Sequence, residues 1–205
     1  MNPRRVSLID AGTGNLRSVE KALRALGAEI EAVRRPEDLR PGQRILLPGV
    51  GAFASFMAGL RAAGLDQAVR QAVQRGDPLL GICVGMQALF ESSEEMGECA
   101  GLGLLPGRVQ RFPDLPGLKI PHTGWNSLRQ TQPSPLLDGL GEDPYVYFNH
   151  SYLCQAAPED EAAESLYGQA FASVVQRGRL YGVQFHPEKS QRVGLRILDN
   201  FLTQG

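Results

Sequence analysis

The sequence predicts an α/β domain in which helices flank a mostly parallel central sheet, with additional antiparallel strands in the second half of the chain. Short apolar segments alternate with segments of helical spacing from residue 6 to residue 92, and this alternation is typical of a parallel sheet covered on both faces. After residue 100 the apolar segments are separated by turn-rich stretches instead. The 205 residues, 42% of them hydrophobic and 21% charged, suit one domain over residues 1–205 with a sizeable core.

The alternating elements of the first half begin with an apolar strand at residues 6–9. Apolar residues then recur at helical intervals from Leu16 to Leu26 and stop at Gly27, which predicts a helix that ends at this glycine. The other expected elements of this half are strands at residues 29–33, 44–47 and 78–83, a helix at residues 53–75 that Gly64 can interrupt, and a helix at residues 84–92.

The second half is expected to be rich in short strands, which fall at residues 109–112, 119–121, 145–154, 170–176 and 180–185. Residues 177–179 read as a hairpin turn. A final amphipathic helix is expected at residues 193–202. Residues 157–164 hold four acidic side chains and are expected to form a solvated surface loop.

The charge balance and the cysteines exclude several classes of protein. Lys and Arg number 21 against 22 Asp and Glu, for a net charge of −1, which gives no attraction to nucleic acid or anionic membranes. Three cysteines without a CxxC spacing suggest neither a disulfide framework nor a zinc site. No run of about 18 apolar residues occurs and the apolar run near the amino terminus is short. We therefore expect a cytoplasmic protein that is neither exported nor membrane-spanning.

The strongest candidate nucleophile is Cys83, in the sequence Gly81-Ile-Cys-Val-Gly85. It stands where an apolar strand meets a helix, between glycines that relieve crowding in a sharp turn, which is the pattern of a nucleophile elbow. The free N–H groups at the start of that helix favour a thiolate. The alternative, a small buried hydrophobic cysteine, is about equally common for such a pattern.

The candidate base is His186, one of three histidines. It follows an apolar strand and precedes Pro187 and Glu188, and an extended backbone would send the side chains of His186 and Glu188 to the same side. Taken without Cys83, an ordinary surface pair is the more common reading of this segment. His122 and His150 have no flanking acid, and either role, structural or ligand-facing, stays open for them.

Two glycine-rich turns follow strands. Gly49 and Gly51 follow the strand at residues 44–47, at the edge where open α/β sheets bind ligands, although the same pair also suits an ordinary turn. Gly12 and Gly14 resemble the start of a dinucleotide fingerprint, but Arg17 stands where its third glycine is required, so we do not expect a nucleotide site there.

The motif Gly81-Ile-Cys-Val-Gly-Met-Gln87, together with His186-Pro-Glu188, resembles the Cys-His-Glu signature of the triad, or class I, glutamine amidotransferases. Residues 10–15, 47–53, 121–126 and 147–152 further resemble the glutaminase subunits of imidazole glycerol phosphate synthases, which serve histidine biosynthesis. The resemblance covers essentially the whole chain. It implies a flavodoxin-like fold, a single amidotransferase domain, and hydrolysis of glutamine to glutamate and ammonia without a metal or an organic cofactor.

The resemblance also implies roles for individual residues. Cys83 attacks the side-chain amide of glutamine, His186 relays the proton to the leaving ammonia, and Glu188 orients the imidazole. The remaining implied residues are an oxyanion hole formed by the Val84 N–H and a backbone N–H of Gly49, Val50 or Gly51, and a grip on the amino-acid end of glutamine by Gln87, Ser151 and Tyr152.

The family pairs such a subunit with a (β/α)₈ cyclase, to which the ammonia is delivered. This chain has no eightfold βα pattern, so the cyclase is expected to be a separate protein in a heterodimer. The residues at positions resembling the family's subunit interface are Asn15, Trp125, Tyr147 and Lys189. Trp125 suits an interface anchor or a core position, and the sequence does not separate the two.

Three alternatives remain open at this point. The same glutaminase chemistry serves other synthases, such as those for anthranilate, guanylate or pyridoxal phosphate. A cysteine peptidase on the same elbow would cleave peptides but not glutamine. A catalytically silent binding subunit would support its synthase equally well without the Cys83 sulfur.

Overall fold

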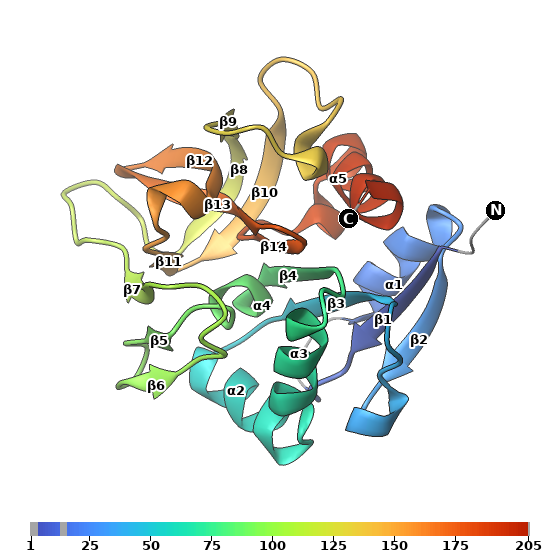
Figure 1. Ribbon diagram of the computed structural model, residues 1–205. Helices are drawn as coiled ribbons and strands as arrows, with labels where there is room; N and C mark the ends of the chain where they lie inside the picture. Colours follow the sequence, from blue (N-terminus) through green and yellow to red (C-terminus); the bar gives the residue numbers. More distant parts are fainter. Residues whose placement is uncertain (1–3, 13–15, 205) are drawn as a thin grey trace.

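The computed structural model, which describes residues 4–12 and 16–204, is built on an eight-stranded sheet of order β2-β1-β3-β4-β14-β13-β12-β9 (Figure 1). The parallel strands are β2 (Glu29–Val33), β1 (Arg5–Ile9), β3 (Arg44–Gly49), β4 (Leu79–Cys83) and β14 (Leu180–Val183). The antiparallel strands are β13 (Gln169–Arg177), β12 (Glu161–Tyr167) and β9 (Arg129–Gln130). The predicted α/β class, with antiparallel strands from the second half, is confirmed. The order of the five parallel strands is that of flavodoxin-like sheets.

Helices cover both faces of the parallel part of the sheet (Figure 1). Helices α1 (Leu16–Ala25) and α5 (Gln191–Gln204) lie on one side, and α2 (Phe53–Ala62) and α3 (Leu65–Gln74) on the other. Every residue of β4 is buried, as expected for a central parallel strand. The expected helix at residues 53–75 is interrupted at Gly64, whose φ of +68° is a conformation that suits glycine.

Two smaller sheets lie beside the main one. The first pairs β8 (His122–Ser127) with β10 (Tyr145–His150), and the second joins β11 (Tyr152–Cys154), β7 (Arg108–Arg111), β5 (Ser92–Ser93) and β6 (Cys99–Ala100). The short 3-10 helices are η1 (Pro36–Asp38), η2 (Pro135–Leu137), η3 (Pro158–Asp160) and η4 (Pro187–Lys189). Strand β10 ends at His150 and β11 starts at Tyr152, so the single strand expected at residues 145–154 is two strands that belong to different sheets.

The expected helix at residues 84–92 is wrong beyond its first turn. Helix α4 spans only Val84–Gln87. The carbonyl of Ala88 accepts a hydrogen bond from the Leu102 N–H, and that of Leu89 accepts from the Leu104 N–H. Because a distant loop uses these carbonyls, the helix does not continue. The single turn supplies free N–H groups to the cysteine, and the dipole of a longer helix is absent.

Two other expectations are wrong. Residues 119–121 form no strand, and β8 begins only after Pro121, which has no N–H to give to a ladder. Residues 157–164 are not a solvated loop, because they include η3 and the first half of β12, with Ala163 fully buried. Within them Asp160 is only 3% exposed and pairs with Arg177, whose Nε lies 2.8 Å from Oδ1. The prediction of a loop rested on the many acidic residues of this segment, which in fact forms part of a strand and contributes Asp160 to an ion pair.

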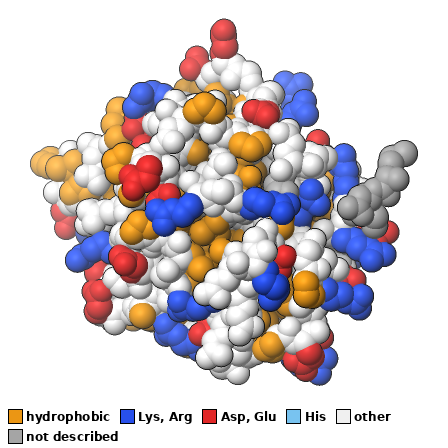
Figure 2. Space-filling model, viewed as in Figure 1, with side chains coloured by type: hydrophobic (Ala, Val, Ile, Leu, Met, Phe, Trp, Pro, Cys, Tyr) orange, Lys and Arg blue, Asp and Glu red, His pale blue; other side chains and the backbone are white. Residues whose placement is uncertain are grey.

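The surface carries no large area of one charge on the face that Figure 2 shows, where Lys and Arg alternate with Asp and Glu. This mixture agrees with the net charge of −1. Among the helices of residues 4–12 and 16–204, none combines the length and the apolar character needed to cross a bilayer.

Backbone contacts between glycines set the position of α4 on the sheet. A Cβ at Gly81 would lie 2.6 Å from the Gly85 carbonyl oxygen, and a Cβ at Gly49 would lie 2.6 Å from the Gly85 nitrogen. A Cβ at Gly85 would overlap the carbonyl oxygen of Leu47. Because these neighbours are backbone atoms of β3 and α4, they cannot rotate away, and only glycine allows β3, β4 and α4 to approach this closely.

We expect Gly85→Ala to lower the free energy of unfolding by about 3 kcal/mol, because a methyl group would be forced into the backbone of β3. The control is Gly42→Ala: the site has open space but a φ of +78°, so the cost there should be about 1 kcal/mol. Urea denaturation measures both. Equal losses for the two variants would contradict the close approach of α4 and β3.

Candidate active site

Cys83 is both the last residue of β4 and the residue that precedes α4. Its φ of 54° and ψ of −113° lie in a region that non-glycine residues rarely adopt. The chain therefore turns from strand to helix at a single residue, which is the elbow that the sequence predicts. Cys83 is buried, with 4% of the residue exposed, and it lines a cavity.

His186 immediately precedes η4 and Glu188 lies within it, a few residues after the end of β14. Nδ1 of His186 is 2.9 Å from Oε1 of Glu188, and the two side chains are 6% and 4% exposed. The Cys83 side chain raises the pKa of His186 through hydrogen bonding and charge, so the two groups lie within interaction distance. Since Nδ1 is used by Glu188, the sulfur faces the other ring nitrogen, Nε2. Strands β4 and β14 are parallel neighbours, with Val183 opposite Ile82, and so both residues emerge at one edge of the sheet.

The surroundings of His186 favour its protonated form. Burial alone would lower the pKa of His186, but the hydrogen bonds to Cys83 and Glu188, together with the charges of these two groups, outweigh burial and raise the pKa to about 9. At neutral pH the ring therefore carries a proton that it can give to a leaving group, and the positive charge lies next to the sulfur.

The cavity at Cys83 has a volume of about 400 Å³. It gathers most of the residues that the sequence singles out. Its lining consists of Val50, Gly51, Cys83, Val84, Gln87, Glu95, Pro121, Asn149, His150, Ser151, Tyr152, His186 and Lys189. Of the other described candidates, Glu188 lies behind His186, and Gly49 pairs with Cys83 in the ladder between β3 and β4.

The backbone on one side of the cavity suits an anion. Val84 is the first residue of α4, and the first N–H groups of a helix have no partner inside it. Val50 and Gly51 face the same cavity, and Gly51 has a φ of +88°, which favours glycine. The loop after β3 and the start of α4 therefore present backbone to the same space as the Cys83 sulfur.

Gln87 and Glu95 are two polar side chains of the cavity that can accept from a cationic group. The amide of Gln87 donates to the Tyr152 carbonyl at 3.3 Å and to Oε1 of Gln184 at 3.1 Å. Because both of its N–H groups are used in this way, the group that Gln87 can offer to a ligand is its oxygen. Glu95 accepts from the Phe53 N–H at 2.7 Å, so the same carboxylate holds the start of α2.

The two other histidines form a buried pair next to the cavity. Nδ1 of His150 lies 2.7 Å from the Tyr152 carbonyl, and Nε2 lies 3.0 Å from Nδ1 of His122. A carbonyl only accepts, so His150 carries its proton on Nδ1 and accepts at Nε2, which places the His122 proton on Nδ1. Burial lowers the pKa of His122 to about 4 and that of His150 to about 3, so both rings are neutral near pH 7.

The sequence interpretation missed Gln184 and Glu95. Gln184 is fully buried, and its Nε2 lies 3.8 Å from the Cys83 sulfur. Its place two residues before His186 on an extended segment could have revealed it, since alternate side chains point the same way. Glu95 carries no such signal, because a loop brings it to the cavity.

The candidate interface residues form an aromatic cluster next to the cavity, which we define as Trp125, Tyr147 and Lys189. The rings of Trp125 and Tyr147 are 6.1 Å apart, and Nζ of Lys189 lies 5.7 Å from the centre of the Tyr147 ring. Trp125 is 46% exposed, so it is a surface residue and not a core residue. The fourth candidate, Asn15, lies outside the described residues.

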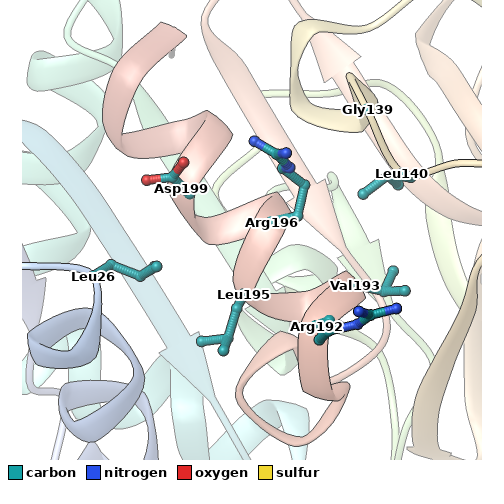
Figure 3. Close-up of a pocket in the computed structure, with 8 residues that line it drawn as sticks. All are labelled: Leu26, Gly139, Leu140, Arg192, Val193, Leu195, Arg196 and Asp199. Atoms are coloured by element: carbon teal, nitrogen blue, oxygen red, sulfur yellow. The ribbon is translucent and has the colours of Figure 1, made fainter.

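A second cavity, of about 490 Å³, lies where α5 meets the end of α1 and the loop at Gly139 (Figure 3). Aliphatic side chains and the charged groups of Arg192, Arg196 and Asp199 line it. None of the described candidate site residues lies there, and its lining contains neither a thiol nor an imidazole. The chemistry therefore points to the cavity at Cys83.

Comparisons with known proteins show the family to which the chain belongs. A family model described as glutamine amidotransferase class-I matches residues 7–204. The imidazole glycerol phosphate synthase subunit HisH of Desulfitobacterium hafniense (strain DCB-2) is 52% identical over 198 residues, which are 96% of this chain and 92% of that protein. The HisH subunit of Salinibacter ruber is 48% identical, covering 95% of this chain and 92% of that protein.

Two further comparisons concern a longer relative and solved structures. The Arabidopsis thaliana protein named imidazole glycerol phosphate synthase hisHF, chloroplastic, is 46% identical over 96% of this chain, but the match covers only 34% of that protein. A solved structure described as a glutamine amidotransferase has a TM-score of 0.74 at 26% identity, and the match covers 96% of this chain and 97% of that one.

The buried histidine pair predicts a loss of stability in mild acid. Since the folded pKa values of His122 and His150 lie below the ordinary value of 6.5, the unfolded chain binds more protons as the pH falls through 6.5, and stability present above that pH is lost. Between pH 7 and pH 5, each of the two rings should lower the free energy of unfolding by about 2 kcal/mol.

The measurement compares urea denaturation at pH 7 and pH 5 for the native protein and for His122→Asn, whose amide can still donate to His150. The variant should lose about 2 kcal/mol less between the two pH values. His186 acts in the opposite direction, because its raised pKa gives stability that is lost as the pH rises toward 9, but it is common to both proteins. Identical pH dependence would show that His122 is not held neutral.

Proposed function

Because this chain belongs to the class I glutamine amidotransferase family, we propose that it hydrolyses glutamine to glutamate and ammonia and supplies the ammonia to a cyclase subunit that makes imidazole glycerol phosphate in histidine biosynthesis. The observation that carries the proposal is the contact of Cys83 with His186, which is itself bonded to Glu188, on one cavity. The names of the relatives supply the synthase, since they describe subunits of imidazole glycerol phosphate synthase at 48–52% identity.

The reaction follows from the proton on His186 and from the sulfur beside it. Cys83 Sγ attacks the side-chain amide carbon of glutamine, and the carbon–nitrogen bond breaks as His186 gives its proton to the leaving nitrogen. Ammonia and a thioester result. Water then attacks the thioester carbon and gives a proton to His186, the carbon–sulfur bond breaks, and its electron pair returns to sulfur. Glu188 holds the ring through Nδ1 in both steps.

The negative oxygen of each tetrahedral intermediate needs donors. We assign this oxyanion hole to the Val84 N–H and to a backbone N–H of the segment Gly49, Val50 and Gly51, which borders the same cavity. Such donors are fixed by the backbone and need no reorganisation when charge develops.

The amino-acid end of glutamine carries an ammonium and a carboxylate. Among the acceptors that face the cavity, the Gln87 oxygen and the Glu95 carboxylate suit the ammonium group. Ser151 and Tyr152 line the same cavity and complete the grip on this end of the substrate. No metal or organic cofactor enters either chemical step.

The cyclase is proposed to be a separate (β/α)₈ subunit that docks on the aromatic cluster, with Asn15 as a further contact. Ammonia is useful to a synthase only while it stays unprotonated, so the partner has to receive it close to Cys83. Lys189 lines the cavity and contacts Tyr147, which joins the docking surface to the active site. We propose a cytoplasmic heterodimer in which residues 1–205 form one amidotransferase domain.

The decisive experiment is a glutaminase assay of the chain with and without the cyclase and its nucleotide ligand, for the native protein and for Cys83→Ala. We expect glutamine-dependent synthesis to fall at least ~10⁴-fold in the variant, because the nucleophile is lost, while synthesis from added ammonium salt continues. Full glutamine-dependent synthesis by Cys83→Ala would exclude a catalytic role for the sulfur. Co-purification with a synthase other than the cyclase would exclude the proposed partner.

We expect Trp125→Ala to weaken binding of the cyclase by about 2 kcal/mol or more, as for a central aromatic anchor. Calorimetric titration measures the affinity. The matched control is Met96→Ala, since Met96 is 88% exposed and lies outside the cluster, and this control should bind normally. Unchanged affinity of Trp125→Ala would place the interface elsewhere.

A further inference from the structure

Gln184 connects the substrate-binding side of the cavity to the nucleophile. It is the first residue after β14 and is fully buried, and its backbone N–H donates to the Ser173 carbonyl at 2.9 Å. Its side chain reaches between Gln87 and Cys83, with Oε1 3.1 Å from Nε2 of Gln87 and Nε2 3.8 Å from the Cys83 sulfur.

The orientation of the Gln184 amide is dictated by its neighbours. The Tyr152 carbonyl can only accept, so the Gln87 atom 3.3 Å from it is the NH₂ group. The same NH₂ group faces Gln184 and requires an acceptor, which is Oε1. The other end of the Gln184 amide, its NH₂ group, therefore points to sulfur. A flipped amide would set two NH₂ groups against each other and leave the sulfur facing an oxygen.

The Tyr152 carbonyl that starts this chain of hydrogen bonds is itself fixed. His150 donates to it at 2.7 Å and is held by His122, so both lone pairs of the carbonyl are occupied by donors. Neither Gln87 nor Gln184 can reorient without leaving a buried polar group unpaired, which is costly.

We propose that Gln184 is a further catalytic residue, which donates an N–H to the Cys83 sulfur and stabilises the thiolate as nucleophile and as leaving group; this inference rests on the proposed glutaminase function. Cys83 is a buried residue, only 4% exposed, so water solvates a charge on its sulfur poorly and protein donors must replace water. His186 supplies one donor and Gln184 supplies a second from the β14 side.

The Gln184 donor is available to the sulfur during hydrolysis of the thioester, when His186 is occupied with the proton of water. When water attacks the thioester, its proton goes to His186, while the carbon–sulfur bond breaks and the electron pair moves to sulfur. At that moment the Gln184 N–H is a donor that already points at the atom on which charge develops. Donors placed in advance at such an atom lower the barrier, because nothing has to reorganise during the step.

Two substitutions separate this role from packing. Gln184→Leu keeps a similar volume without a donor, and Gln184→Glu keeps the shape but places a carboxylate oxygen near the sulfur. The matched control is Gln176→Glu, the same chemical change on neighbouring β13, where the amide of Gln176 donates to Gly178 and lies outside the cavity lining.

The first readout is alkylation by iodoacetamide at pH 7, followed for each cysteine by mass spectrometry. Cys99 is partly exposed and serves as the internal reference, while Cys154 is buried. We expect alkylation of Cys83 to slow about 10-fold in Gln184→Leu and about 100-fold in Gln184→Glu, as for loss of a hydrogen bond to a charged group, with Cys99 unchanged. The Gln176→Glu control should match the native protein.

The second readout is glutaminase activity of the complex with the cyclase. We expect kcat to fall about 10-fold in Gln184→Leu with KM for glutamine changed less than about threefold. A native alkylation rate of Cys83 in a folded Gln184→Leu, or a rise in KM with native kcat, would overturn the proposal. If Gln184→Glu does not fold, the leucine variant alone decides. Alkylation needs no glutamine, so a native complex without glutaminase activity would defeat the proposed function and leave this readout intact.

Discussion

The site depends on one constraint, the contact of the Gly85 backbone with the Leu47 carbonyl and with Gly49. Because no Cβ intervenes, α4 lies directly on the ends of β3 and β4, and the chain must turn from strand to helix within Cys83. The turn aims the sulfur at the cavity and sets the Val84 N–H beside it. The loop after β3 reaches the same place since Gly49 is the ladder partner of Cys83. The position of the sulfur and that of the backbone proposed to bind the oxyanion thus have one geometric cause.

Parallel pairing of β14 with β4 brings His186 close to Cys83. Residues 83 and 186 are far apart in the chain, yet β14 runs parallel to β4, and the carboxyl ends of parallel neighbours meet at one edge. Strand β10 adds a further support: the Tyr147 carbonyl accepts from the His186 N–H at 2.9 Å, and Ser190 Oγ accepts from the Tyr147 N–H at 2.9 Å. The backbone of His186, which follows β14 of the main sheet, is therefore also fixed by β10 of a second sheet.

The sequence predicted those features that depend on residues close together in the chain. The strands of the parallel sheet, the break at Gly64 and the elbow at Cys83 follow from apolar spacing and from glycine, and they were predicted. The end of α4 depends on amides of a loop at residue 102 and beyond, and the buried state of Asp160 depends on Arg177, so neither could be found from nearby residues. The motif indicated the three proposed catalytic residues, Cys83, His186 and Glu188. The orientation of Gln184, by contrast, follows only when the Tyr152 carbonyl and Gln87 are considered together.

At Cys83, the backbone conformation that presents the sulfur also lowers the stability of the fold. A side chain held at φ 54° costs on the order of 1–3 kcal/mol, and glycine would relieve that cost while deleting the sulfur. Selection for thermal stability alone would therefore favour glycine at position 83, although that variant lacks the sulfur. Keeping the sulfur at this position therefore lowers the stability of the folded protein. Substitutions that stabilise an engineered form have to be sought outside this turn.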